Sequence, residues 1–293
     1  MNRDPRLARR LFNRFEPVHA VTYFSPEARA AFDGLGFRGF WMGYFAGRSA
    51  PLGVVPAEVV SALFYNFAPD RVAKSLPAAW EIASPAAALR AREDSAVAAL
   101  RRYGLTDDGV RIAAELAGKA ARGAPLDARP LFAANLALSW PSEPLAALWH
   151  AATLLREQRG DGHVAVLAAS GISGREANVL HAVAGRVTRE MIERSRHYDD
   201  EQWRHYQDRL ARRGLLDRDG ALTDAGRALE QSIEDTTDAL ALTALDALDD
   251  AEVEQLFRTL TPITRAVVAA GDLPIDTPMG LSRDGLDDSA DLA

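Results

Sequence analysis

The sequence predicts a mainly α-helical protein in which one structural unit occurs twice. The string RRYG-LTDDG at residues 101–109 returns as RRG-LLDRDGA-LTDAG at residues 212–226, with seven residues added in the second copy. A helical pattern of apolar residues follows each string, and a Glu-Pro pair precedes each copy, at positions 16–17 and 143–144. A repeat of this kind predicts a fold made of two similar units, independently of any single motif.

In the second copy, residues 173–185, 187–195 and 199–213 are predicted to form three helices with short breaks between them. In the third helix, apolar residues such as Trp203 and Leu210 recur on one stripe, and the opposite side is charged. The pattern therefore predicts three surface helices that each bury one face.

The segment after the third helix contains turn signals. Gly214 ends the helix, and residues 215–222 read as two short apolar segments around the tight-turn dipeptide Asp219-Gly220, which predicts a β-hairpin. Thr223 is placed to cap a closing helix. Three helices, a hairpin and a closing helix make a winged helix-turn-helix, with residues 199–213 at the position of the recognition helix.

Residues 172–240 resemble the multiple-antibiotic-resistance (MarR-like) type of regulator. The resemblance rests on a helix that ends in Arg213-Gly214-Leu215, a wing, and then the string Leu-Thr-x-x-Gly at residues 222–226. It implies a winged helix-turn-helix fold and the possibility of DNA binding.

The first copy has corresponding helices but no wing. Residues 56–67, 70–82 and 84–103 supply the helices, and Gly104 is followed at once by the Leu-Thr-Asp string, which leaves no room for a hairpin. We therefore expect a tandem winged helix-turn-helix, a pseudo-twofold fused dimer in one polypeptide with one degenerate, wingless half. The expected divisions are a degenerate repeat at 1–121, a linker at 122–142, a repeat with an intact wing at 143–271, and an acidic, disordered tail at 272–293.

The composition indicates a soluble protein of two domains. The chain has 293 residues, of which 48% are hydrophobic. It has no apolar run long enough for a membrane span, no signal sequence at its start and no cysteine, so we expect a cytoplasmic protein without disulfides or thiol chemistry. The net charge is −7, but residues 272–293 hold six Asp and one Arg, so the rest of the chain is close to neutral and DNA binding stays possible.

The helix at 199–213 and the wing carry candidate DNA contacts. The candidate residues are Arg189, Gln202, Arg204, His205 and Arg218, with Arg194 and Arg196 as further phosphate contacts. Four acidic residues between positions 199 and 208, and two in the wing, oppose phosphate binding. The alternative is that this surface is a solvated helix face on a scaffold that no longer binds DNA.

Unusual polar residues concentrate in the helices before each winged unit. Such helices meet across the twofold axis of MarR-like dimers, so we expect a small-molecule cleft between the two repeats. The candidate ligand-binding residues are Glu16, His19, Tyr23, Arg48, His150, Arg156, Arg159, Asp161 and His163. The sequence identifies no cofactor.

These polar residues also fit purely structural roles. The arginines and acidic residues of the string REQRGDGH fit an ion-pair network at a helix end as well as they fit a ligand site. His19 and His150 also fit the role of histidines buried in the core. A metal site from His19, His150, His163, Glu16 and Asp161 is an alternative, although no histidine pair has helical spacing. The aromatic residues at 40–45 fit core packing, and no catalytic motif is present.

The strings EPVH, YFAGRSAPLG, SWPSEP and REQRGDGH resemble an actinobacterial family of tandem winged-helix proteins without a settled activity, over residues 10–270. This resemblance implies the fold and no catalytic residue. The sequence thus favours a ligand-responsive, DNA-binding transcriptional regulator, most simply as a monomeric pseudo-dimer. The alternative is a winged-helix scaffold used as a small-molecule-binding protein or an enzyme.

Overall fold

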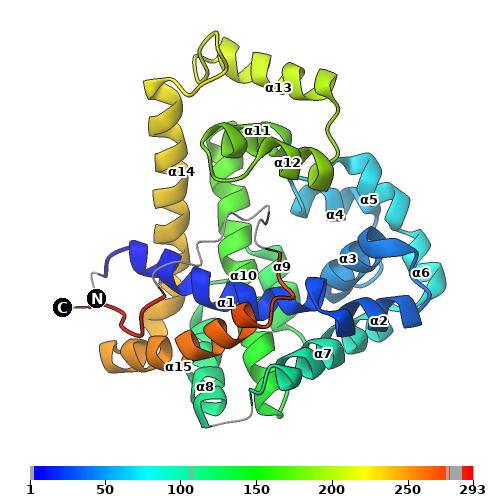
Figure 1. The fold of residues 1–293 in the computed structure, drawn as a ribbon, viewed down its shortest axis with the longest axis vertical. Coiled ribbons are helices and arrows are strands. Elements are labelled where there is room, and N and C mark those ends of the chain that lie inside the picture. Colours follow the sequence, from blue (N-terminus) through cyan, green and yellow to red (C-terminus); the bar gives the residue numbers. More distant parts are fainter. Residues whose placement is uncertain (1–2, 106–107, 275–276, 278–285, 293) are drawn as a thin grey trace.

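The computed structural model describes residues 3–105, 108–274, 277 and 286–292, and these residues form helices joined by short loops (Figure 1). The helices are α1 (Arg6–Phe24), α2 (Pro26–Gly34), α3 (Gly39–Ser49), the 3₁₀ helix η1 (Ala50–Leu52), α4 (Ala57–Leu63), α5 (Pro69–Ser75), α6 (Ala78–Ile82), α7 (Pro85–Arg102), α8 (Asp108–Gly123), α9 (Pro130–Leu136), α10 (Pro144–Ala169), α11 (Gly174–Val183), α12 (Arg189–Arg196), α13 (Asp200–Arg212), α14 (Asp224–Leu242), the 3₁₀ helix η2 (Thr243–Ala247) and α15 (Asp250–Ala269).

Helix α10 forms the centre of the molecule. Its first half is apolar on every side, so this part of the helix has to be covered all round. The helices α1, α7, α8, α9 and α14 supply the cover, and Figure 1 shows α10 crossing the middle of the fold. Within the described residues, no helix has the length and hydropathy needed to cross a membrane.

Apolar side chains form three clusters. The largest lies around α1, α8, α10 and α15, the second joins α3 to α7, and the third joins the end of α10 to α11–α14. Tyr65, from the loop between α4 and α5, packs against the third cluster. The helices α11–α14 therefore have a core of their own, and α14 also packs against α1 in the first half of the chain.

The helices predicted in the second half are present, because their ends are encoded locally. Ser173 and Glu176 form a capping box at the start of α11, and Asp199 and Gln202 form another at the start of α13. The Thr188 side chain also caps the start of α12. Figure 1 places α13 at the periphery of the molecule, above α11 and α12.

The segment expected to form a β-hairpin contains a single antiparallel bridge, between Leu216 and Leu222. The backbone N–H of Asp217 donates to the carbonyl of Ala221, and the Asp217 carboxylate accepts from the N–H groups of Asp219 and Ala221. The turn is thus held by an aspartate side chain in place of a longer ladder. No strand is formed among the described residues.

In the first half, the repeated string again closes a helix. Gly104 ends α7 and Gly214 ends α13, both with positive φ, at 82° and 72°. Residues 106 and 107, where the wing is missing from the sequence, lie outside the described residues. Helix α7 packs against α1, α2, α3 and α10, whereas α13 packs mainly against α11. Helix α7 thus buries one face against several helices, and its other face, with Ala86, Arg90, Asp94 and Ala98, is exposed.

Three details differ from the expectations. The two Glu-Pro pairs are not equivalent, because Pro17 lies inside α1 whereas Pro144 begins α10. The expected linker at 122–142 contains the helix α9. In the tail that was expected to be disordered, residues 286–292 pack on α1, where Arg14 donates to the carbonyl of Asp287 at 2.6 Å and Ala290 is buried.

Candidate functional site

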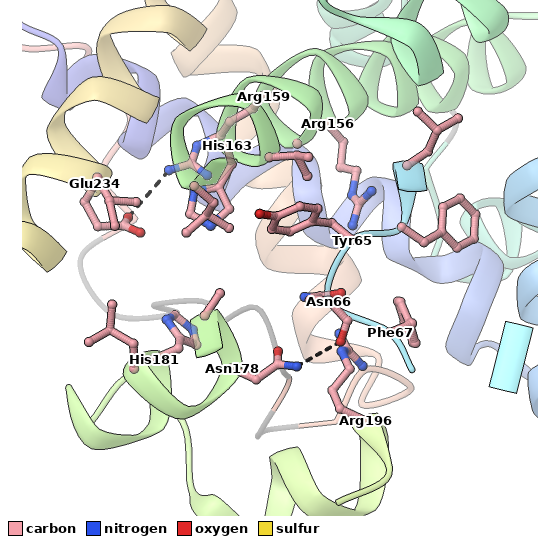
Figure 2. A pocket seen from close by; sticks show the side chains of 18 of the residues that line it. Tyr65, Asn66, Phe67, Arg156, Arg159, His163, Asn178, His181, Arg196 and Glu234 are labelled. Atoms are coloured by element: carbon pink, nitrogen blue, oxygen red, sulfur yellow. Dashed lines mark hydrogen bonds and ion pairs between the residues drawn. The ribbon is translucent and has the colours of Figure 1, made fainter. Parts of the chain in front are cut away.

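A cavity of about 200 Å³ lies between the two halves of the chain (Figure 2). Its walls come from α1 and α3, from α10 and α14, from α11 and α12, and from the end of α4 with the loop that follows it. The charged and polar residues on its wall are Arg9, Arg48, Arg156, Arg159, Arg196, His163, His181, Asn66, Asn178, Glu230 and Glu234. Aromatic side chains, among them Phe64 and Phe67, supply much of the remaining surface.

An ion-pair network of buried groups forms one wall. The Arg48 guanidinium donates to both carboxylate oxygens of Glu157, at 3.0 and 3.1 Å, and Arg156 donates to the same carboxylate at 2.9 Å. Burial alone would raise the pKa of Glu157, but Arg156 and Arg48 together hold it well below its usual range. The Arg48 guanidinium also lies 4.2 Å from the centre of the Phe64 ring.

Glu16 lies behind this network. Its carboxylate is fully buried and has no hydrogen-bond partner in the described part of the chain, with Arg156 Nε at 3.5 Å. Burial raises the pKa of Glu16 to about 7, against the attraction of Arg156. Glu16 therefore exchanges a proton near neutral pH in the layer beneath the cavity wall.

The opposite end of the cavity contains paired charges and neutral histidines. Arg159 donates to Asp238 at 2.7 Å, and Arg9 pairs with Glu234. His163 shares a hydrogen bond with the Thr237 hydroxyl at 3.0 Å. Burial lowers the pKa of His163 to about 3 and that of His181 to about 4, so both rings are uncharged at neutral pH.

Arg196 differs from the other arginines of the wall. Its side chain is 7% exposed, its guanidinium lies 4.2 Å from the centre of the Phe67 ring, and its Nε has no hydrogen-bond partner among the described residues. Its hydrogen bond to the carbonyl of Ser195 is long, at 3.4 Å. Within the described residues no carboxylate lies within 4.0 Å of it. Burial lowers its pKa to about 10, so Arg196 keeps its charge at neutral pH.

The two halves meet beside the cavity through hydrogen bonds from side chains of one half to backbone carbonyls of the other. The Tyr65 hydroxyl donates to the carbonyl of Ile172 at 2.6 Å, and the Asn178 side chain donates to the carbonyl of Asn66 at 2.8 Å. At Gly174, the first residue of α11, an added Cβ would lie 1.9 Å from the carbonyl oxygen of Tyr65. This approach requires a residue without a side chain.

The structure brings together only part of the expected ligand-binding set. Arg48, Arg156, Arg159 and His163 line the cavity, and Glu16 lies behind them. His19 is buried against Thr153 and Tyr23, and so neither His19 nor Tyr23 reaches the wall.

His150 and Asp161 face a different side of α10. The His150 ring packs against Trp140, and Asp161 accepts a hydrogen bond from the backbone N–H of Phe132. The expectation that His19 and His150 share one concavity is wrong. The proposed metal ligands therefore lie apart, and no group of three potential ligands gathers among the described residues.

The expected residues of α10 lie on different faces of the helix. Positions 156, 160, 163 and 167 all line the cavity and follow the i, i+4, i+7, i+11 pattern of one face. His150 and Asp161, which are eleven residues apart, share another face. Sequence reasoning missed Tyr65, Asn66, Asn178, His181 and Arg196; for Arg196, the spacing of four from the buried Ile192 was the available signal. Arg196 was expected to contact phosphate, and instead points inward.

The candidate DNA-binding residues lie on α12, on α13 and in the turn that follows α13. Arg204, His205 and Arg218 are exposed, and Arg204 donates to the carbonyl of Asp200 on its own helix. Arg189 is held by Glu193 and Asp200, and Gln202 belongs to the capping box of α13. The free basic groups of this surface are therefore fewer than the sequence suggested.

Comparison with known proteins gives one match. No curated protein and no solved structure shows significant similarity to the chain. A model that describes a helix-turn-helix family matches residues 8–274, which is most of the chain and includes both halves. The protein therefore belongs to this helix-turn-helix family.

Proposed function

We propose that the protein is a ligand-responsive DNA-binding transcriptional regulator of MarR-like, tandem winged-helix type. The observation that carries this proposal is the position of α12. This helix contributes Arg196 to the cavity wall, and only residues 197–199 separate it from α13, the exposed helix in the recognition position. A ligand in the cavity thus acts on the helix that precedes the DNA-binding one.

The coupling follows from where the cavity lies. Arg48 and Tyr65 belong to the first half, and Asn178 and Arg196 to the second, so one ligand contacts both. A ligand shifts a conformational equilibrium only by its difference in affinity for the two states. Contacts that exist only when α12 is docked provide such a difference, and typical couplings of about 1–3 kcal/mol correspond to changes of about 5- to 150-fold in DNA affinity.

The DNA-binding surface in this proposal consists of Arg204, His205 and Arg218, with α13 in the major groove. The first half acts as a structural partner, because its corresponding helix α7 packs against α1, α2, α3 and α10, whereas α13 packs mainly against α11. The chain then functions as a monomeric pseudo-dimer in which one half supplies the DNA-binding helix. Multi-angle light scattering tests this arrangement, since a stable dimer would contradict it.

The test is fluorescence anisotropy on DNA from immediately upstream of the protein's own gene. We expect Arg204→Ala to weaken binding, because it removes an exposed cation from α13 without disturbing an ion pair. Arg111→Ala removes an exposed arginine from the distant helix α8, where its ion pairs with Asp108 and Glu115 also lie at the surface. This variant is the control and should bind as wild type does. Equal affinity of the two variants overturns the assignment of the surface.

A second function is favoured by one specific observation. Between Asp199 and Arg212, α13 and its cap carry four acidic residues and three basic ones, and Asp217 and Asp219 flank Arg218 in the wing. Acidic groups beside phosphate reduce affinity. A chain that binds its small molecule but no DNA, even at low salt, would be a ligand carrier or an enzyme on the same scaffold.

A further inference from the structure

We propose that the ligand of the cavity is a small molecule with an oxyanion group, a carboxylate or a phosphate, which binds against Arg196 and Arg156. The proposal deepens the function proposed above by naming the chemical class of its ligand. It depends on the cavity and its charges and on no property of DNA.

The charges of the wall give the first reason. Arg48 and Arg156 share Glu157, Arg159 pairs with Asp238, and Arg9 pairs with Glu234. Arg196 is as buried as these groups, and no carboxylate lies within reach of it in the described part of the chain. A buried charge without a counter-ion is costly, and an anionic ligand removes that cost.

The geometry around Arg196 gives the second reason. Its guanidinium lies over the Phe67 ring, an arrangement that occupies the flat face of the group, and in the described part of the chain its edge makes only the long bond to the Ser195 carbonyl. In Figure 2, Arg196 extends from α12 toward the cavity, and Arg156 extends toward it from α10. Planar guanidinium groups match the oxygen pairs of carboxylates and phosphates.

The size and remaining lining limit the rest of the ligand. A cavity of about 200 Å³ is somewhat larger than the cavity of about 150 Å³ that accommodates a benzene ring, so it fits about one ring and its anionic group. Phe64 and Tyr44 offer aromatic surface, whereas the neutral His163 and His181 offer hydrogen bonds without charge. The charge of the ligand is therefore recognised at the Arg196 end.

The experiment is isothermal titration calorimetry of the full-length protein with small probes of different charge. Benzoate, phenyl phosphate and inorganic phosphate carry the oxyanion; benzamide is the neutral control and benzylamine the cationic one. We expect at least one oxyanion to bind and both controls to bind at least about tenfold more weakly, since hydrogen bonds to charged groups dominate the recognition. Binding by benzoate alone identifies a carboxylate ligand, and binding by the phosphates alone identifies a phosphate ligand.

Two variants on the same helix complete the test. Arg196→Gln should weaken oxyanion binding by about tenfold to a hundredfold. Arg194→Gln, which changes an exposed arginine of α12, should leave binding unchanged. Because Arg196 is buried without a carboxylate, Arg196→Gln should also unfold at the same urea concentration as the ligand-free wild type or at a higher one, whereas a purely structural arginine would leave the variant less stable.

The proposal is overturned if benzamide binds as tightly as benzoate, if no oxyanion binds at millimolar concentration, or if Arg196→Gln binds the oxyanion as wild type does. A loss of stability in Arg196→Gln overturns it as well. Failure of the protein to bind DNA affects only the function proposed above, because these titrations contain no DNA.

Discussion

Replacing Gly174 by alanine tests how the two halves are held together. Gly174 is the first residue of α11 and has no unusual backbone angle, so alanine is compatible with its conformation. The added Cβ would lie 1.9 Å from the carbonyl oxygen and 2.5 Å from the carbonyl carbon of Tyr65. Both are backbone atoms, which cannot rotate away as a side chain does. The loop and α11 therefore have to separate.

The size of the effect follows from what is lost on separation. Forcing an extra carbon into a packed contact costs about 1–3 kcal/mol. The hydrogen bonds from Tyr65 to Ile172 and from Asn178 to Asn66 contribute about 0.5–1.5 kcal/mol each. We expect Gly174→Ala to lower the free energy of unfolding by about 2–4 kcal/mol. The total is smaller than the full sum because separating the two segments relieves the strain while it breaks the hydrogen bonds.

Urea denaturation followed by circular dichroism measures this change. Gly34→Ala is the matched control, because Gly34 also lies in a helix and an added Cβ there meets no atom within 4 Å. The control should equal wild type or be more stable by up to about 1 kcal/mol, since alanine is the better helix former. If Gly174→Ala unfolds at the same urea concentration as Gly34→Ala, the reasoning about the contact between the halves is refuted.

Two further predictions concern the buried charges. Arg48→Met should destabilise the protein by about 3–5 kcal/mol, because it leaves the buried Glu157 carboxylate with one partner fewer. In thermal denaturation, the double variant Arg48→Met with Glu157→Leu should recover part of the lost stability. No recovery would contradict the pairing of Arg48 with Glu157. Burial raises the pKa of Glu16 from 4.5 to about 7, amid Arg156, Glu157, Arg48 and Arg159, so its contribution to stability is fully present below pH 4.5 and is lost as the pH rises through 7. In urea titrations between pH 4.5 and pH 8, wild type should therefore lose on the order of 3 kcal/mol of stability relative to Glu16→Gln. If the stability difference between the two proteins does not change with pH, Glu16 is ionised throughout this range.

The helices of the second half were predictable because their signals are local. A Ser or Asp followed three residues later by Glu or Gln begins α11 and α13, and Gly214 ends α13 with a positive φ. The same signal, Gly104, ends α7 in the first half. These features depend on a few neighbouring residues, which the sequence displays directly.

The position of α1 was not predictable from local signals. The Glu-Pro pair at 16–17 was matched to the pair at 143–144 as the beginning of a repeat, but Pro17 lies within α1, whereas Pro144 begins α10. A helix that packs against α10 and α15 gains enough from burial to tolerate one proline. Tertiary packing therefore overrode the local preference.

The sequence indicated where the cavity lies, but it did not indicate all of the residues that line it. The sequence indicated a cluster of polar residues between the repeats, and Arg48, Arg156, Arg159 and His163 do line a cavity there. Asn66 and its neighbours in the α4–α5 loop have no periodic pattern to mark them, and they reach the cavity only through docking of α11 on that loop. Long-range contacts of this kind are absent from single-sequence signals.

The most direct test of ligand-responsive DNA binding is an anisotropy titration of the upstream DNA over a series of salt concentrations, with and without the oxyanion that calorimetry identifies. We predict that the protein binds at low salt, that the affinity falls linearly on logarithmic axes as salt rises, and that the oxyanion changes it by about 5- to 150-fold at constant ionic strength. Absence of binding at low salt, or an affinity that is the same with and without the oxyanion, would contradict the proposed function.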